Sequence, residues 1–329
     1  MRVLKFIGWT VAWVIAFLCA LWSIGALYYD FPKHLGAAAA LVFVGVLLAA
    51  AIFVRGKVLK LASLFAAFSL VLIWWLTLKP SNDRHWQTDV AETAWAETNG
   101  DDVTIHNLRN CDYRTEEDFT IHWETRTVQL SKMTGMDLAI MYWGSPWMAH
   151  PIVSFRFADA LPLCFSIETR KQVGQEYSAL RGLYRQYTLI YIVADERDSI
   201  RVRSNYRHGE DVYLYRTLAS PDQARARFRE YLKTLNMLHT QPRWYNAITT
   251  NCTTNIRTQR PTSQRAPWDW RMLVNGKADE MLYGHHAIAT GGLPFSELKQ
   301  RSLINQRARA ADKDPDFSRL IRDGLPRGD

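Results

Sequence analysis

The chain has 329 residues, 48% of them hydrophobic and 12% aromatic, with 17 Gly, 12 Pro and 4 Cys, which excludes collagen-like, low-complexity and disulfide-scaffold proteins. Its net charge of +8 is unevenly distributed, because residues 1–80 hold seven of the 40 lysines and arginines but one of the 32 acidic residues. The remainder is nearly neutral, so the basic balance does not indicate a nucleic-acid partner.

Three uncharged apolar runs fill the N-terminal region. They are Phe6–Tyr29 with 24 residues, Leu35–Val54 with 20 and Leu61–Leu78 with 18. A helix that crosses the hydrocarbon core needs about 20 apolar residues, so each run predicts a transmembrane helix. A cleavable signal peptide has one shorter run, and a buried hairpin of a soluble protein would have a polar face. Residues 1–80 are therefore expected to be three transmembrane helices.

The cations around these runs predict the orientation. Five lie before the first run or between the second and third, and two lie on the opposite side: Arg2, Lys5, Arg55, Lys57 and Lys60 against Lys33 and Lys79. Positive charge favours the cytoplasmic side. We therefore expect an inner-membrane protein with a cytoplasmic N-terminus, and residues 80–329 in the periplasm of a Gram-negative cell.

Beyond Pro80 the composition becomes polar, and eight runs rich in Val, Ile, Tyr, Phe and Thr follow between Asp-, Gly- and Pro-containing turns. These strand-like runs are Val103–Leu108, Phe119–Leu130, Asp137–Tyr142, Pro151–Phe157, Leu163–Thr169, Leu189–Ala194, Ser199–Ser204 and Val212–Tyr215. Their spacing of about ten residues favours an antiparallel sheet over βαβ units.

Helices are expected mainly after the strands. Ser220 to Gln223 reads as an N-cap, a proline at the first helical position and a capping box, followed by apolar residues at helical spacing. A second helix is expected from near Asn251 to Pro261, and helical pieces near Ala278–Tyr283 and Phe295–Ala311. The fold class is thus α+β, with a domain at 81–261 and a C-terminal extension at 262–329.

The four cysteines are candidates for reactive thiols or disulfide partners. Cys19 lies in the first apolar run, where a thiol is a small apolar residue. Cys111 and Cys164 lie in or beside separate strand-like runs, and both a disulfide and two free thiols fit the sequence. If they pair, Cys252 is an unpaired thiol in an exported domain.

The surroundings of Cys252 favour a nucleophile. Asn251 is a plausible N-cap, so that Cys252 and Thr253 fall in the first turn of the expected helix. Backbone N–H groups at a helix start lower a thiol's pKa and can hold the oxyanion of a tetrahedral intermediate. The alternative is a buried free cysteine beside a cap.

A thiol nucleophile needs a base, and His150 is the best placed of nine histidines because it stands at the rim of a strand-like run. Glu168 on the next run could fix its tautomer, although a pair with Arg170 or Arg126 explains that carboxylate equally well. His285 and His286 lack a nearby cysteine or paired carboxylate, so no metal is predicted. No phosphate-binding glycine loop, dinucleotide fingerprint or CxxC pair occurs, so no cofactor is predicted.

Several segments carry a family resemblance. They are Ser81–Arg84 with Trp86, Ile105–Asn110 with Tyr113 and Arg114, Trp143–Pro146 through His150 to Phe155, Phe165–Lys171, Tyr184–Tyr187, Ala194–Asp198 and Asn251–Asn255. Together, over roughly residues 82–260, they resemble the N-terminal periplasmic domain of the Lnb-type lipoprotein intramolecular transacylase family, formerly a domain of unknown function.

The resemblance implies a permuted papain-like (NlpC/P60-like) thiol fold, in which histidine and its polar partner precede the cysteine-bearing helix. The order His150, Glu168, Cys252 agrees with it. Characterised members move a fatty acyl chain from a lipoprotein's diacylglyceryl group to its own N-terminal amine. Cys252 would then accept the acyl group, His150 would be the base and Glu168 its orienting partner.

One departure concerns the membrane helices, which follow the domain in that family and precede it here, so the acyl acceptor could be water or another amine. We expect a membrane-anchored thiol acyltransferase or hydrolase with membrane lipids or lipoproteins as substrates. Tyr142, Trp143 and Trp147 could line an acyl groove or pack in the core. The alternatives are a cell-wall amidase or endopeptidase with the same Cys-His site, and a non-catalytic envelope scaffold.

Overall fold

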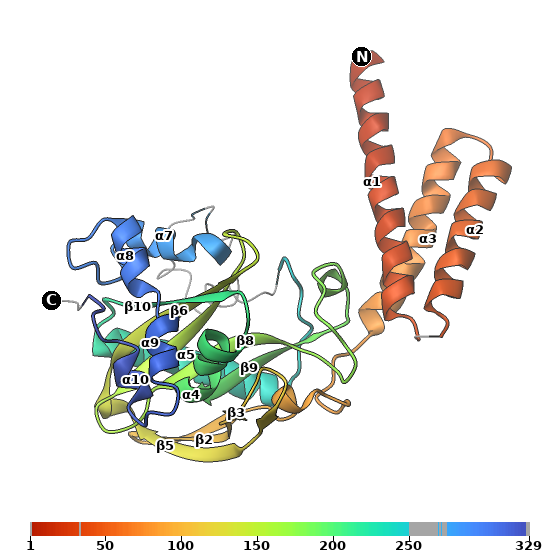
Figure 1. Ribbon diagram of the computed structural model, residues 1–329. Coiled ribbons are helices and arrows are strands. Elements are labelled where there is room, and N and C mark those ends of the chain that lie inside the picture. Colours follow the sequence, from red (N-terminus) through yellow and green to blue (C-terminus); the bar gives the residue numbers. More distant parts are fainter. Residues whose placement is uncertain (1, 33, 250–268, 270, 272–274, 327–329) are drawn as a thin grey trace. The chain divides into compact units, whose positions relative to one another are not determined.

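The computed structural model describes residues 2–32, 34–249, 269, 271 and 275–326 (Figure 1). The chain divides into two units, which are described separately. The helical unit comprises residues 1–81, 176–188 and 244–248, and the sheet unit comprises residues 82–175, 189–243 and 249–329.

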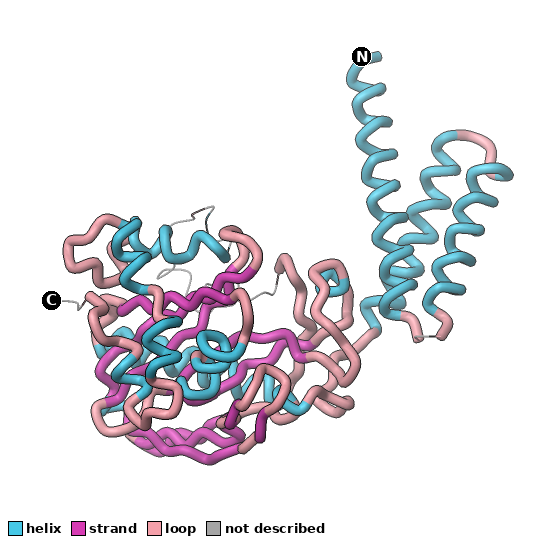
Figure 2. The backbone as a smooth tube through the Cα atoms, viewed as in Figure 1, coloured by secondary structure: helices cyan, strands magenta, loops and turns pink. Residues whose placement is uncertain are grey.

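The three expected apolar helices are present in the helical unit (Figure 2). They are α1 (Arg2–Asp30), α2 (Gly36–Phe53) and α3 (Lys57–Thr77), and each is long and apolar enough to cross a membrane. Small residues such as Ala26 and Ala40 let the helices approach closely, and Phe43 and Val71 fill the space between them. Most of their other side chains are exposed, as is appropriate for helices that face lipid.

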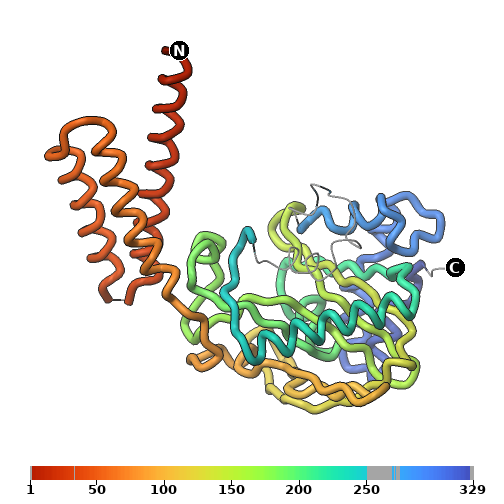
Figure 3. Tube along the Cα trace, turned by 180° about the vertical axis from the view of Figure 1, so that it is seen from behind, coloured from red at the N-terminus to blue at the C-terminus, as the bar shows by residue number. Residues whose placement is uncertain are grey.

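Two segments from beyond the helices also belong to the helical unit. Residues 176–188 include the short 3₁₀ helix η3 (Arg181–Leu183), and residues 244–248 run beside them (Figure 3). The backbone N–H of Tyr245 donates to the carbonyl of Tyr187 at 3.0 Å, and that of Ala247 to the carbonyl of Gly182 at 2.9 Å. No sequence pattern indicated that these two segments associate with the apolar helices.

The described part of the sheet unit contains an eight-stranded sheet in the order β1-β2-β9-β8-β7-β6-β10, with β5 also paired to β2, and a separate ribbon of β3 and β4. The strands are β1 (Trp95–Asn99), β2 (Asp102–Arg109), β3 (Asp112–Tyr113), β4 (Phe119–Thr120), β5 (Trp123–Gln129), β6 (Met133–Trp143), β7 (Ala149–Phe157), β8 (Leu163–Arg170), β9 (Thr188–Asp195) and β10 (Glu210–Arg216). The registered pairs are antiparallel except β2 with β9, so the expected α+β class with a mainly antiparallel sheet is confirmed.

The strand expected at Ser199–Ser204 is wrong. That segment instead forms α4 (Glu196–Ser199) and a π-helical turn, η4 (Val202–Tyr206). The Asp195 side chain caps α4 by accepting from the Arg197 N–H at 2.9 Å. Arg201 and Arg203 are buried as well as their apolar neighbours, so this segment does not have the one exposed face of a half-buried strand.

Helices cover both faces of the sheet. On one face lies α5 (Pro221–Thr240) (Figure 3), whose predicted capping box forms. Its Phe228 packs on Phe155 and Phe165 of neighbouring strands. The opposite face carries the C-terminal helices α9 (Asn305–Ala310) and α10 (Phe317–Leu320), with Ile152 in their shared core.

The remaining helix predictions concern the C-terminal region. The expected pieces near 278–283 and 295–311 are confirmed by α7 (Ala278–Gly284), α8 (Phe295–Ser302) and α9. The helix expected from near Asn251 to Pro261 lies outside the described residues.

Candidate active site

Strand register brings His150 and Glu168 together. In the antiparallel pair β7–β8, Ile152 stands opposite Ser166. Extending this register by two residues brings His150 level with Glu168, and their side chains meet, with His150 Nε2 at 3.1 Å from Glu168 Oε1. Because strand side chains alternate between the two faces, His150, Ser166 and Glu168 all project to the same face of the sheet.

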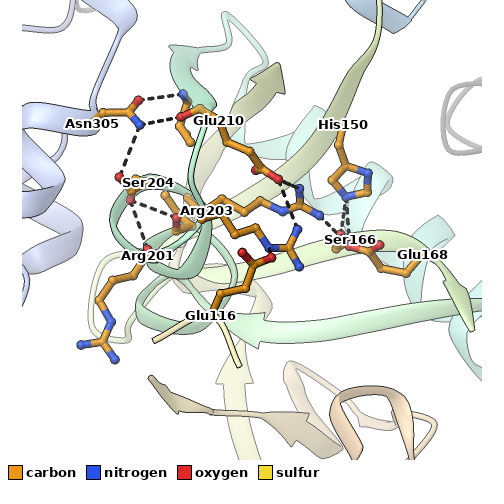
Figure 4. A network of polar contacts seen from close by, with 12 residues as sticks. Glu116, His150, Ser166, Glu168, Arg201, Arg203, Ser204, Glu210 and Asn305 are labelled. Atoms are coloured by element: carbon orange, nitrogen blue, oxygen red, sulfur yellow. Dashed lines mark hydrogen bonds and ion pairs between the residues drawn. The ribbon is translucent and has the colours of Figure 1, made fainter. Parts of the chain in front are cut away.

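The three side chains form a compact hydrogen-bonded group (Figure 4). The Nε2 atom of His150 lies 2.7 Å from the Ser166 hydroxyl and 3.1 Å from Oε1 of Glu168, and Ser166 donates to the same carboxylate at 2.6 Å. With Ser166 donating to Glu168, this network assigns a proton to Nε2. The carboxylate therefore fixes both the tautomer and the orientation of the ring.

Arg203, for which the sequence predicted no role, also contacts the group of His150, Ser166 and Glu168. Arg203 contacts Oε1 of Glu168 at 3.4 Å with one guanidinium nitrogen and Oε2 of Glu210 at 3.2 Å with the other. Asn305 donates to the carbonyl of Glu210 at 2.8 Å, which ties α9 to the same region (Figure 4). Ser166 could have been found from its position two residues before Glu168 on a strand. Arg203 could not, because its segment was predicted to be a strand.

The surroundings of Glu168 keep it ionised. Burial by itself raises the pKa of this carboxyl group, but the charge and hydrogen bond of His150, the Arg203 guanidinium and the Ser166 hydroxyl together hold that pKa well below its ordinary value. The side chain is 28% exposed, so the carboxylate lies at an accessible rim rather than in a sealed core. An anionic carboxylate in this position stabilises a protonated imidazole.

The alternative partners considered for Glu168 are wrong. Arg126 pairs with Asp195 at 3.1 Å. Arg170 is buried, and its guanidinium lies 4.4 Å over the ring of Trp86. Neither arginine holds the carboxylate that faces His150.

The three aromatic residues proposed for a groove fall into two kinds. Tyr142 is buried, donates to the carbonyl of Gly276 at 3.1 Å and packs in the core, which is the second of the two roles considered for it. Trp143 and Trp147 are exposed on the connection that leads from β6 to His150. Of these three aromatic residues, Trp143 and Trp147 are the two with exposed side chains.

Cys111 and Cys164 are not disulfide-bonded in the structure. They lie in different core clusters, so the unpaired alternative is the one observed. Burial, then the charge of Asp198, raises the pKa of Cys111 to about 12, and burial with the charge of Glu196 raises that of Cys164 well above its ordinary value. Both thiols therefore stay protonated at neutral pH.

The other half of the predicted site cannot be placed. Asn251, Cys252 and Thr253, with the helix expected to start there, lie outside the described residues. The described residues thus include His150 and Glu168 of the predicted site, and Cys252 lies outside them.

Metal ligands were considered at the histidines as well. Within the described ranges, no three His, Cys, Asp or Glu side chains lie together in a way that could hold a metal ion. His285 contacts Asp269 at 3.3 Å, and that carboxylate is also paired with Arg271 at 2.7 Å. The carboxylate near His285 thus belongs to an ion pair.

Three helices able to span a membrane, together with a mainly antiparallel α+β unit, define a membrane protein with a large domain outside the bilayer. Residues 119–276 match the family model of the Lnb N-terminal periplasmic domain. The resemblance carried by the motifs is thereby confirmed, and the protein is a membrane protein with a periplasmic domain. No curated protein and no solved structure matches the chain.

Proposed function

We propose that this protein is a thiol acyltransferase or hydrolase, anchored in the inner membrane, that acts on acyl groups of lipids or lipoproteins in the periplasm. In this proposal the N-terminus is cytoplasmic, residues 81–261 form the catalytic domain, and residues 262–329 are an extension packed on it. The supporting observation is the group of His150, Ser166 and Glu168 inside a domain of the Lnb family.

The chemistry assigned to His150 follows from its contacts. Glu168 and Ser166 hold Nε2, so Nδ1 is the ring nitrogen that takes the thiol proton of Cys252. The thiolate attacks an ester carbonyl, and the resulting imidazolium protonates the departing alkoxide to leave a thioester on the sulfur. In the second half-reaction, the imidazole accepts a proton from an amine or water, which attacks the thioester and releases the thiol.

Elimination among the four cysteines supports Cys252 as the nucleophile. Cys19 lies within α1, and Cys111 and Cys164 are buried thiols with raised pKa values. Cys252 stands after a candidate N-cap at Asn251, with Thr253 beside it, where helix N–H groups would favour a thiolate and hold an oxyanion. The chain order of His150, Glu168 and Cys252 fits a permuted papain-like arrangement.

The membrane anchor supports a lipid or lipoprotein substrate. Tethering a catalytic domain beside a bilayer raises the effective concentration of membrane-embedded esters. Trp143 and Trp147 provide exposed apolar surface on the connection that leads to His150, and they are our candidates for the acyl-chain contact.

The test is intact-protein mass spectrometry of the full chain after incubation with vesicles that carry a diacylglyceryl peptide. We expect a hydroxylamine-labile acyl adduct on Cys252 that is absent from Cys252→Ser and His150→Ala. His122→Ala removes an exposed histidine of the same unit and should leave the adduct unchanged. Each variant is checked for folding by circular dichroism.

Acylation retained in both Cys252→Ser and His150→Ala would overturn the proposal. Cleavage of muropeptides by the wild type, without any adduct from the diacylglyceryl donor, would instead identify the site as that of a cell-wall amidase or endopeptidase.

A further inference from the structure

Three exposed apolar side chains lie on the two segments that join the helical unit. Tyr177 is 50% exposed, Leu180 54% and Ile248 68%. They lie on segments 176–188 and 244–248, which run side by side (Figure 3). The Ala247 backbone N–H donates to the Gly182 carbonyl and joins the two segments. Exposed apolar residues grouped in this way mark a contact surface more often than isolated ones do.

The packing of Tyr184 against α1 shows how far segment 176–188 reaches along the apolar helices. Tyr184 is buried against Ala26 and Val71, and its hydroxyl lies so near α1 that a Cβ atom on Gly25 would be only 1.9 Å from it. Gly25 stands five residues before the end of α1 at Asp30, which is about 7.5 Å along a helix. The segment 176–188 therefore reaches alongside the helices rather than stopping at their ends.

A polar cluster fixes the same segment to the ends of the helices. The carboxylate of Asp30 accepts from the Arg185 backbone N–H at 3.1 Å, from the Gln186 side chain at 2.7 Å and from the Trp75 indole at 2.7 Å. The Arg185 guanidinium lies 3.9 Å over the Trp75 ring, and the Trp244 indole donates to the carbonyl of Leu78 at 3.3 Å. Trp and Arg at the ends of apolar helices are typical of a membrane–water interface.

We propose that residues 176–188 and 244–248 are membrane loops, whose tips at Tyr177, Leu180 and Ile248 enter the leaflet at the Asp30 end of α1. The partner is the lipid bilayer that α1–α3 cross. Lipid fits better than a protein partner because the anchoring contacts lie at the depth of the apolar helices, where the surrounding solvent is hydrocarbon.

This inference also deepens the proposed function, on which the following step rests. Ile248 precedes Cys252 by four residues in the sequence. A loop held in the leaflet at residue 248 is separated from the proposed nucleophile by only four positions of the chain, which favours esters that the leaflet presents, such as those of diacyl lipids and lipoproteins. The substrate class is therefore an ester presented from the leaflet.

The experiment places an environment-sensitive fluorophore on Leu180→Cys or Ile248→Cys, in a full chain that also carries Cys252→Ser. The protein is reconstituted in vesicles of phosphatidylethanolamine and phosphatidylglycerol. We expect the fluorophore at both positions to be quenched by doxyl-labelled lipid and protected from aqueous iodide. Leu218→Cys, at a similarly exposed leucine of the sheet unit, is the matched control and should show the reverse.

Quenching by iodide at positions 180 and 248 as strong as at 218 would overturn the inference. Protection from both quenchers would also overturn it, because it would show a protein contact such as a second copy of the chain.

A second measurement separates this inference from the proposed function. The double variant Leu180→Asp with Ile248→Asp should form the Cys252 adduct at least tenfold more slowly from a vesicle-borne donor, and equally fast from a soluble short-chain thioester. An equal loss with both donors would count against a membrane role for the loops. No adduct in the wild type with either donor would refute the proposed function, while lipid quenching would still support the loops.

Discussion

Two clusters of charged side chains occupy the same face of the sheet and both include β7, yet they offer different chemistry. The rim cluster consists of His150, Ser166, Glu168, Arg203 and Glu210, and the core cluster of Asp137, Ser154, Arg156, Glu196 and Arg322. In each, a serine donates to a glutamate, Ser166 to Glu168 at 2.6 Å and Ser154 to Glu196 at 2.5 Å. Similar residue types on one face of the sheet therefore do not by themselves make a site.

The exposure of their side chains and the types of ionisable group distinguish the two clusters. In the core cluster the side chains of Asp137 and Glu196 are 0% exposed, and Arg322 bonds to both, at 2.8 and 2.6 Å. Burial opposes the charge of Arg322, but these two carboxylates raise its pKa, so it holds its proton. The rim cluster instead contains the His150 imidazole, a side chain that can accept or donate a proton at its ring nitrogens, beside a carboxylate that is 28% exposed. Of these two clusters, the rim cluster is therefore the candidate for proton transfer.

The largest expected effect tests the structural role of the core cluster. Arg322→Met should lower the free energy of unfolding by about 3–5 kcal/mol, because it leaves buried carboxylates without their guanidinium. Arg319→Met, which removes an exposed pair with Asp316, should cost about 0–1 kcal/mol. Chemical denaturation in detergent, followed by near-UV circular dichroism, measures both. Equal stability of the two variants would show that the core cluster is not the anchor of the C-terminal segment.

A substitution in the rim cluster should lower the rate of adduct formation without a large loss of stability. Glu168→Gln keeps the shape of the side chain and removes the charge that orients and stabilises the His150 imidazolium. We expect the rate of adduct formation at Cys252 to fall by about 100-fold or more, within the usual range for general acid–base catalysis. The matched variant Glu196→Gln in the core cluster should lower stability and leave the rate per folded molecule unchanged. A reversed pattern would exchange the roles assigned to the clusters.

Much of this comparison could be predicted from local sequence. Runs rich in β-branched and aromatic residues between turns located β7 and β8, and their proximity in sequence favoured them as neighbours. Their observed register, with Ile152 opposite Ser166, brings the His150 and Glu168 ends of the strands together. The capping box at Ser220 predicted α5 for the same reason, since its signal lies within four residues. Such features depend on interactions between residues close in the chain.

Other features depended on contacts between distant residues and had no local signal. Arg203 reaches Glu168 from a π-helical turn 35 positions later, and Arg322 reaches Asp137 across 185 positions. The hydrogen bond that the Arg185 backbone N–H donates to the Asp30 carboxylate likewise joins positions 155 apart. No periodicity within a single element reports such long-range contacts, because each charged side chain taken alone resembles a solvated surface charge.

The smallest effect concerns pH and sharpens the electrostatic account of the rim cluster. Because the pKa of Glu168 in the folded protein is held well below its unfolded value of about 4.3, its interactions stabilise the fold fully above that value and are lost as the pH falls through the lowered one. The stability difference between wild type and Glu168→Gln should therefore be about 1 kcal/mol at pH 5 and shrink toward zero below pH 4. Denaturation curves for both proteins at each pH measure it. A difference that persisted unchanged at pH 2.5 would mean that the carboxylate is not stabilised in its ionised form by His150 and Arg203, and the role of Glu168 as the partner of an imidazolium would lose its electrostatic basis.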